Sequence, residues 1–201
     1  MDTANTTSGN VINILFKSLF KSHTVSSIAK LLGMSRVGIW KTLKKLEESK
    51  FVILTPVGEG KTSTYGVTLN WDNVLVEKKL AVLLTEEAFK EERWRFNFAE
   101  LERNVSFLFL FGSILHSPKD ASDIDIFVVL DNKNKFNEVT EIISKIQKTQ
   151  PKKIHFIDLT IDEFEKELND KNKAYLDALS KGVVLFGQEN FIRLIKRVQT
   201  K

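Results

Sequence analysis

The sequence predicts an α/β (α+β) protein built from two domains, and three observations support this fold class. Helical periodicity dominates the first 50 residues, and two short strand-like segments follow it. Beyond residue 104, apolar runs of strand length alternate with helical segments, which is typical of a mixed sheet with flanking helices. The chain has 201 residues, 42% of them hydrophobic, which is enough for one large or two modest domains with filled cores.

The first domain is predicted over residues 10–70 and begins with three helices. The apolar residues of the first recur at the spacing of one buried helix face: Val11, Ile12, Leu15 and Leu19. Thr24 is a suitable N-cap for a second helix over residues 25–32, and Ser35 for a third from Arg36 to about Ser49. The short turn between the second and third helices contains Gly33, so the pair reads as a helix-turn-helix.

Two strand-like segments, residues 51–55 and 64–69, come next and flank the glycine-rich stretch 56–61, which predicts a hairpin. This order of elements resembles the winged helix-turn-helix domains of prokaryotic regulators. The resemblance covers residues 10–70, and its most specific part is the stretch 28–35 followed by Ile39, Leu43 and Leu46.

The first domain is also the basic part of the chain. Residues 1–70 hold nine Lys and Arg against four Asp and Glu, whereas residues 71–201 hold twenty-one against twenty-two. A basic domain of this kind predicts contact with a polyanion, here DNA. The predicted DNA-binding residues are those of the third helix and the hairpin tip: Arg36, Trp40, Lys41, Lys44 and Lys61.

Within the third helix, Ile39, Leu43 and Leu46 form the inward stripe, so the basic residues lie on or near the outward face. Arg36 would reach base edges near the N-terminus of the helix, and the lysines would reach phosphates. The alternative is an ordinary solvated face on which Trp40 packs against a neighbour.

Residues 71–104 are predicted to form a helical connector. No glycine or proline occurs between Gly66 and Gly112, and helix-forming residues are frequent, with a break expected near Thr85. Aromatic residues mixed with charges, such as Trp94 and Phe96, predict packing between domains or across a homodimer.

The second domain, residues 105–201, opens with the most informative motif of the chain. An apolar strand over 105–111 ends in Gly112-Ser113, and the next strand, 123–130, begins with Asp123 and Asp125. A tight glycine turn exposes backbone N–H groups to phosphate, and acids two residues apart share one face of a strand. Carboxylates are the ligands preferred by hard cations such as Mg²⁺, so a metal site is predicted here.

These residues resemble the nucleotidyltransferase superfamily that includes DNA polymerase beta, and within it the small prokaryotic minimal nucleotidyltransferases. The resemblance covers roughly residues 100–187 and rests on three stretches, 110–113, 122–128 and 181–187. It implies an enzyme that transfers NMP from an NTP, with Gly112 and Ser113 holding the phosphates and Asp123 and Asp125 holding Mg²⁺ or Mn²⁺. Many relatives carry an arginine shortly after the Gly-Ser pair, and this chain does not.

A third carboxylate normally completes such a site, and the candidate strand is 153–159. The key position falls on Asp158 or on His155, which point to opposite faces because their separation is odd. Asp158 is favoured as catalytic and metal-binding because a carboxylate is the chemically suitable group. With His155 in that place, catalysis becomes doubtful, and the alternative function is a DNA-binding transcriptional regulator with a nucleotide-sensing or inactive domain.

The remaining elements follow from periodicity: helices over 135–150, 161–181 with Thr160 as cap, and 188–199, and a strand over 183–186. The chain has no cysteine, which excludes disulfides and thiolate-zinc sites. The three histidines are scattered, so oxygen ligands are expected to dominate any metal site. No apolar run approaches the ~20 residues that span a bilayer, and the N-terminus does not resemble a signal peptide, which predicts a cytoplasmic protein without a membrane partner.

Overall fold

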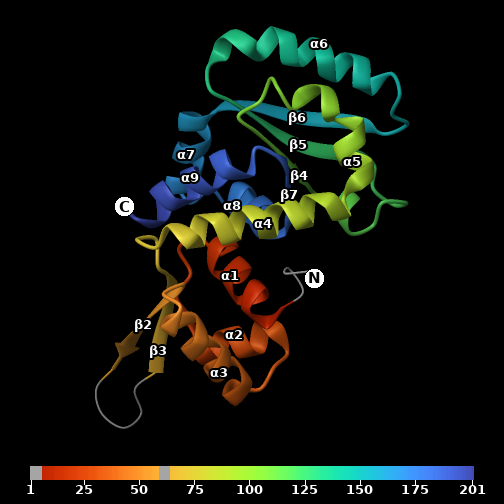
Figure 1. Cartoon of the computed structure of the whole chain (residues 1–201). Coiled ribbons are helices and arrows are strands. Elements are labelled where there is room, and N and C mark those ends of the chain that lie inside the picture. The colour runs from red at the N-terminus through yellow and green to blue at the C-terminus, as the bar shows by residue number, and fades with distance from the viewer. Residues whose placement is uncertain (1–5, 59–63) are drawn as a thin grey trace. The chain divides into compact units, whose positions relative to one another are not determined.

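The computed structural model describes residues 6–58 and 64–201, and the chain divides into two compact units (Figure 1). Unit 1 comprises Met1–Leu83 and unit 2 comprises Leu84–Gln199. Helices and two separate sheets make up these units, so the predicted α/β (α+β) fold class is confirmed. In the part of the chain that the structure describes, no helix is long and apolar enough to cross a membrane.

Unit 1 begins with α1 (Thr7–Lys17), α2 (Val25–Leu32) and α3 (Arg36–Glu48). Two predicted caps are confirmed. The Thr24 hydroxyl accepts from the Ser27 amide at 3.2 Å, and the Ser35 hydroxyl accepts from the Gly38 amide at 3.1 Å. These bonds satisfy N–H groups that have no acceptor within their own helix.

The sheet of unit 1 has three antiparallel strands in the order β1-β3-β2: β1 (His23–Thr24), β2 (Val52–Val57) and β3 (Thr64–Leu69). The predicted hairpin corresponds to β2 and β3, which pair from Val52 with Leu69 to Val57 with Thr64. The sequence did not predict β1, because two residues are too few to show a strand pattern.

The connector differs from the prediction at its break. Helix α4 (Val74–Lys90) continues past Thr85 without interruption, because the stretch consists of helix-forming residues and contains no glycine or proline. The chain turns at Glu91 into α5 (Glu92–Asn97), and a short 3₁₀ helix, η1 (Ala99–Leu101), follows.

Unit 2 contains a mixed sheet in the order β6-β5-β4-β7. Its strands are β4 (Phe107–Phe111), β5 (Asp123–Leu130), β6 (Lys153–Thr160) and β7 (Val183–Phe186). Strand β4 runs antiparallel to β5 and β7, whereas β5 and β6 are parallel. The 3₁₀ helices η2 (Ser113–Leu115) and η3 (Lys133–Lys135) flank β5 in the chain.

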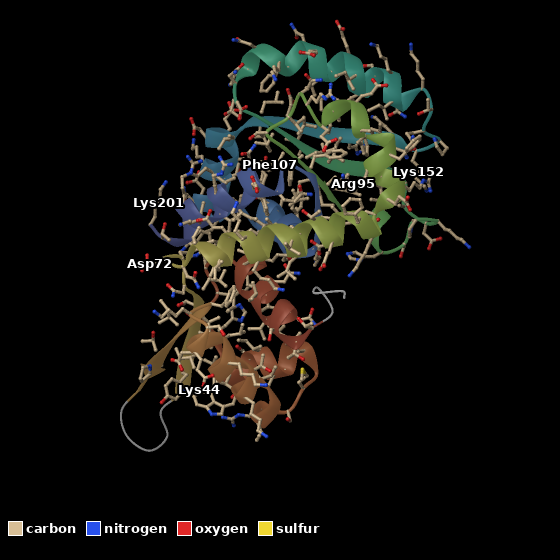
Figure 2. The ribbon with its side chains drawn as sticks, in the orientation of Figure 1. Lys44, Asp72, Arg95, Phe107, Lys152 and Lys201 are labelled. Atoms are coloured by element: carbon tan, nitrogen blue, oxygen red, sulfur yellow. The ribbon has the colours of Figure 1, made fainter. Side chains whose placement is uncertain are left out.

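The two faces of this sheet are covered differently. Alternate residues of β5, such as Ile124 and Ile126, pack with residues of α5 and α6 (Phe136–Gln147). On the other face, Phe127 stacks on Tyr175 of α8 (Lys173–Lys181) and meets Phe164 of α7 (Ile161–Asn169) edge-on. Phe107, labelled in Figure 2, meets Phe191 of α9 (Gln188–Gln199) with ring centroids 5.3 Å apart.

The predicted single helix over 161–181 is two helices. Helix α7 ends before Asp170, Lys171 takes a positive φ of 55°, and the Asn172 side chain caps α8 by accepting from the Ala174 amide. Asn is a strong N-cap and tolerates non-helical backbone, so this polar stretch starts a new helix rather than continuing the old one.

Candidate functional site

Asp123 and Asp125 lie at the start of β5 on one face of the sheet, as predicted. Both are partly buried, and they share this face with Phe127, two residues further along the strand. The antiparallel register places Asp125 opposite Phe111, the last residue of β4. The acids therefore lie next to the point where β4 ends in Gly112.

The Gly112 turn touches Asp125 directly. Gly112 has φ +85°, and a Cβ at this position would lie 2.4 Å from Oδ2 of Asp125. Any side chain would have to displace the carboxylate, and the positive φ adds strain for residues other than glycine. The turn and the carboxylate are thus in contact because residue 112 has no side chain.

His155 completes this cluster. Strands β5 and β6 are parallel with Asp125 opposite His155, so the two side chains lie on one face of the sheet. Nδ1 of His155 is 3.1 Å from Oδ2 of Asp123 and 3.8 Å from Oδ1 of Asp125. One ligand atom from each of the three residues lies within 4.8 Å of the others.

The structure does not bring Asp158 to this cluster. Asp158 pairs with Val128 and lies three residues beyond His155, about 10 Å along the strand at ~3.3 Å per residue. Because that separation is odd, Asp158 also points to the opposite face, the one covered by α6. The placement favoured from sequence for Asp158 is therefore corrected, and the position beside the aspartates belongs to His155.

The electrostatics of the pair are unfavourable without a cation. Burial raises the pKa of Asp125 above its ordinary value, and the neighbouring Asp123 carboxylate raises it further, while His155 acts in the opposite direction. Two partly desolvated like charges at one place cost free energy that a bound cation would offset. Two carboxylates and an imidazole are donors that a divalent ion accepts, so the residues fit such an ion.

A pocket of about 290 Å³ lies beside the Gly112 turn. One wall is formed by the turn and the other by one face of α8, and its lining residues are Phe111, Gly112, Ser113, His116, Ala174, Asp177, Ala178 and Lys181. Residues 174, 177, 178 and 181 have the i, i+3, i+4, i+7 spacing of a single helix face. The polar side chains in this lining are those of Ser113, His116, Asp177 and Lys181, so a hydroxyl and an ammonium group lie there together with an imidazole and one carboxylate.

Residues 96–189 match a known family model. Its description is Polymerase beta, Nucleotidyltransferase. All three stretches that carry the resemblance in the sequence lie inside the matched residues, which supports the nucleotidyltransferase part of that resemblance.

Other comparisons add little to the nucleotidyltransferase match. No curated protein matches the chain. Among solved structures, a heme sensor protein, PefR from Streptococcus agalactiae in complex with heme, matches at 13% identity over 74% of this chain and 76% of that chain, with a TM-score of 0.34. Heme-free PefR matches at 14% identity over 73% and 80% of the two chains, with the same TM-score. At these TM-scores the likeness carries no argument about fold or function.

Lys181 lies within the matched residues 96–189 and was not among the site residues predicted from the sequence. Lys181 reaches the pocket because the next residue, Gly182, lies very close to β4. A Cβ on Gly182 would lie 2.2 Å from Cε1 of Phe109 and 2.7 Å from the Leu110 carbonyl oxygen. The signal in the sequence is the Lys181-Gly182 pair at the end of an amphipathic helix. Only the fold places that pair beside the Gly112 turn.

The loop that enters β5 is held by Lys152, labelled in Figure 2. Its ammonium group donates to the Ala121 carbonyl and also reaches the Lys119 carbonyl at 3.4 Å. These contacts fix the segment immediately before Asp123. Lys152 therefore joins the start of β6 to the loop that precedes the aspartates.

Outside the matched residues 96–189, four of the five residues predicted to bind DNA lie along α3: Arg36, Trp40, Lys41 and Lys44. Ile39, Leu43 and Leu46 are buried as the inward stripe, and Arg36 and Lys41 are exposed. Lys61 lies outside the described residues.

Two of the predicted DNA-binding residues of α3 have partners within unit 1. Trp40 packs against Tyr65 with ring centroids 5.1 Å apart, and Lys44 lies over the Trp40 ring at 4.9 Å and pairs with Glu47 at 2.8 Å. An open groove of about 510 Å³ lies beside Trp40 and Tyr65, and its lining residues are Val25, Arg36, Val37, Trp40, Thr64 and Tyr65.

Proposed function

We propose that the protein is a metal-dependent nucleotidyltransferase that transfers NMP from an NTP to an acceptor and releases pyrophosphate. The observation that carries this proposal is the contact between the Gly112 turn and the cluster of Asp123, Asp125 and His155, inside the residues that match the nucleotidyltransferase family. The acceptor's oxygen forms a bond to the α-phosphorus as the bond to the leaving pyrophosphate breaks.

Each part of the site has a role in this reaction. Asp123 and Asp125 hold a divalent ion, Mg²⁺ or Mn²⁺, which supplies positive charge to the phosphate oxygens when bound. Gly112 and Ser113 receive the phosphates at the turn, and Lys181 faces them from α8. Fixed positive charge of this kind stabilises the charge that develops on a transferring phosphoryl group. Lys181 would thus supply a positive charge beside the Gly-Ser pair, after which this chain lacks the arginine that many relatives carry.

The test is transfer of label from α-³²P-NTP in the presence of Mg²⁺ or Mn²⁺ to protein, RNA and small-molecule acceptors. Replacing both acids, by Asp123→Asn and Asp125→Asn, is expected to abolish transfer. Asp158→Asn is the matched control, because it removes an acid from the opposite face of the neighbouring strand. A well-folded wild-type protein that transfers no label, and whose nucleotide and metal binding the double variant does not change, contradicts the proposal.

The role of Lys181 gives a separate prediction. Lys181→Ala is expected to weaken NTP affinity about tenfold or more, because a hydrogen bond to a charged group contributes ~1.5–3 kcal/mol. Lys173→Ala, at the other end of the same helix and outside the pocket, is the control. Equal NTP affinities for the two variants, measured by calorimetry, contradict a phosphate-binding role for Lys181.

We also propose that unit 1 is a winged helix-turn-helix domain that binds DNA through α3. The support is the order of three helices and an antiparallel hairpin, the basic composition, and the exposed Arg36 and Lys41. Trp40 and Tyr65 add an apolar groove beside them, suited to contact with bases rather than phosphates. Binding that does not weaken with salt, or no binding at low salt, contradicts this proposal.

A second candidate function is a DNA-binding regulator whose nucleotidyltransferase-like region senses a nucleotide without turnover. The observation that favours it is His155, since an imidazole lies where active relatives are expected to carry a third carboxylate. Specific DNA binding that an NTP alters, with no label transfer, supports this candidate against the enzyme.

A further inference from the structure

The cluster at the start of β5 differs from a purely acidic one in its third donor. Two donors are carboxylate oxygens, and the third is an imidazole nitrogen, Nδ1 of His155. This nitrogen faces both acids, at 3.1 Å from one and 3.8 Å from the other. All three donors therefore lie within 4.8 Å of one another.

We propose that His155 is a direct ligand, together with Asp123 and Asp125, of one divalent ion, and that its nitrogen makes the site select a first-row transition ion such as Mn²⁺ or Co²⁺ over Mg²⁺. The inference rests on the proposed metal-binding role of the two aspartates. It adds the kind of ion and the residue that chooses it.

The spacing of the donors fits one small ion. Bonds of ~2.1 Å, as transition ions and Mg²⁺ form with nitrogen and oxygen, place donors at right angles about 3 Å apart. The two separations from Nδ1 of His155, 3.1 and 3.8 Å, lie close to this value, and all three donors lie within 4.8 Å of one another, which is compatible with one ion after the side chains move closer together. The backbone register that sets these separations comes from β5 and β6 and needs no rearrangement.

The chemistry of the donors selects among ions of that size. Mg²⁺ is a hard cation that takes oxygen ligands and retains water, whereas imidazole suits the transition ions, whose affinities rise from Mn²⁺ towards Cu²⁺. A neutral imidazole also leaves the cluster with two negative charges instead of the three of an all-carboxylate site. Two charges balance one divalent ion.

The competing arrangement is an ordinary hydrogen bond in which Nδ1–H donates to Asp123. In that case the nitrogen carries a proton and cannot bind a metal. The two arrangements predict different metal selectivity, and His155→Asp separates them because it restores three carboxylates on the same face.

The experiment is calorimetric titration of the full chain with Mn²⁺, Co²⁺ and Mg²⁺ in the absence of nucleotide. Wild type is expected to bind Mn²⁺ and Co²⁺ more tightly than Mg²⁺. The dissociation constant for Mg²⁺ divided by that for Co²⁺ is expected to fall about tenfold or more in His155→Asp, which corresponds to ~1.4 kcal/mol. Pulsed electron paramagnetic resonance of the Mn²⁺ complex is expected to show ¹⁴N coupling in wild type and none in His155→Asp. Asp158→Asn is expected to keep both properties, and circular dichroism checks that each variant is folded.

The outcomes for metal choice and for catalysis are distinct. Wild type that binds Mn²⁺ without ¹⁴N coupling, or a ratio that His155→Asp leaves unchanged, overturns the inference, and label transfer in the same preparation leaves the transferase proposal standing. Nitrogen coupling with no label transfer to any acceptor supports the inference and counts against the transferase. Binding of none of the three ions overturns the inference and removes the support for the transferase.

Discussion

Among single residues, Gly112 allows the turn after β4 to lie in contact with the Asp125 carboxylate. We expect Gly112→Ala to lose metal and NTP binding, because its Cβ would meet Oδ2 of Asp125 at 2.4 Å. Gly33→Ala is the matched control: it shares a positive φ, +63°, but its Cβ would meet no atom within 4 Å. Gly33→Ala should lower the free energy of unfolding by ~1 kcal/mol and retain metal and NTP binding. Calorimetry on both variants tests this, and retained metal binding by Gly112→Ala would contradict it.

His23 is a residue whose burial predicts a pH effect on unit 1. It is 5% exposed, and both ring nitrogens lack a hydrogen-bond partner among the residues that the structure describes. Burial, followed by the charge of Lys21, lowers its pKa below the ordinary value of 6.5. The unfolded chain therefore binds the proton more readily, so unit 1 should lose stability as the pH falls below 6.5.

Hydrogen exchange of the amides of α1, α2 and α3 at pH 7.5 and pH 5 measures this loss. The variant His23→Leu removes the titrating group and should show a smaller difference between the two pH values. An equal difference in wild type and variant would mean that another group is responsible.

At the scale of elements, the first turn of α7 is stabilised by a reciprocal cap. The Glu163 carboxylate accepts from the Thr160 amide at 2.9 Å, and the Thr160 hydroxyl accepts from the Glu163 amide at 3.2 Å. An ion pair with Lys133, and then the bond from Thr160, lower the pKa of Glu163 from 4.5 to about 2. The sequence predicted Thr160 as the cap, and the structure confirms it.

Glu163→Gln is expected to destabilise unit 2 at neutral pH. A depressed pKa means that the carboxylate stabilises the fold above pH 4.5 and that this contribution is lost as the pH falls towards 2. Urea unfolding of wild type and variant should therefore differ at pH 7 and converge near pH 2. Asp162→Asn, an acid of the same turn outside the cap, should show a smaller difference at pH 7.

The pairing of β5 with β6 decides which side chain of β6 lies beside the two aspartates. In sequence, His155 and Asp158 both belong to one predicted strand, and chemical suitability favoured the carboxylate. The observed parallel register pairs Asp125 with His155, which places Asp158 on the α6 face. A shift of one residue would reverse the two faces, so the register determines which side chain joins the aspartates.

At the scale of the whole molecule, the candidate DNA-binding residues and the candidate metal ligands belong to different compact units. We expect Lys41→Ala to reduce the salt slope of DNA binding by about one and leave metal and NTP affinities unchanged. Asp125→Asn should weaken metal and NTP binding and leave the salt slope of DNA binding unchanged, because it alters the metal site and no contact with DNA phosphates. Fluorescence anisotropy across a salt series and calorimetry measure the two properties, and loss of metal binding in Lys41→Ala would contradict the separation.

The elements that depend on local pattern and local chemistry could be predicted from the sequence. The caps at Thr24, Ser35 and Thr160, the buried stripe of α3, and the Asp-x-Asp start of β5 follow from residues close together in the chain, where hydrogen bonds and periodicity act over one turn or one strand. The family match over residues 96–189 supports the nucleotidyltransferase resemblance drawn from those same motifs.

The contacts between residues far apart in the chain could not be predicted in this way, because they depend on the folded arrangement of the strands and helices. His155 reaches the aspartates through the register of a parallel pair, and Lys181 reaches the Gly112 turn because Gly182 lets α8 approach β4. Such contacts join residues about 30 to 70 positions apart, and their geometry depends on strand pairing and close packing that no local pattern specifies.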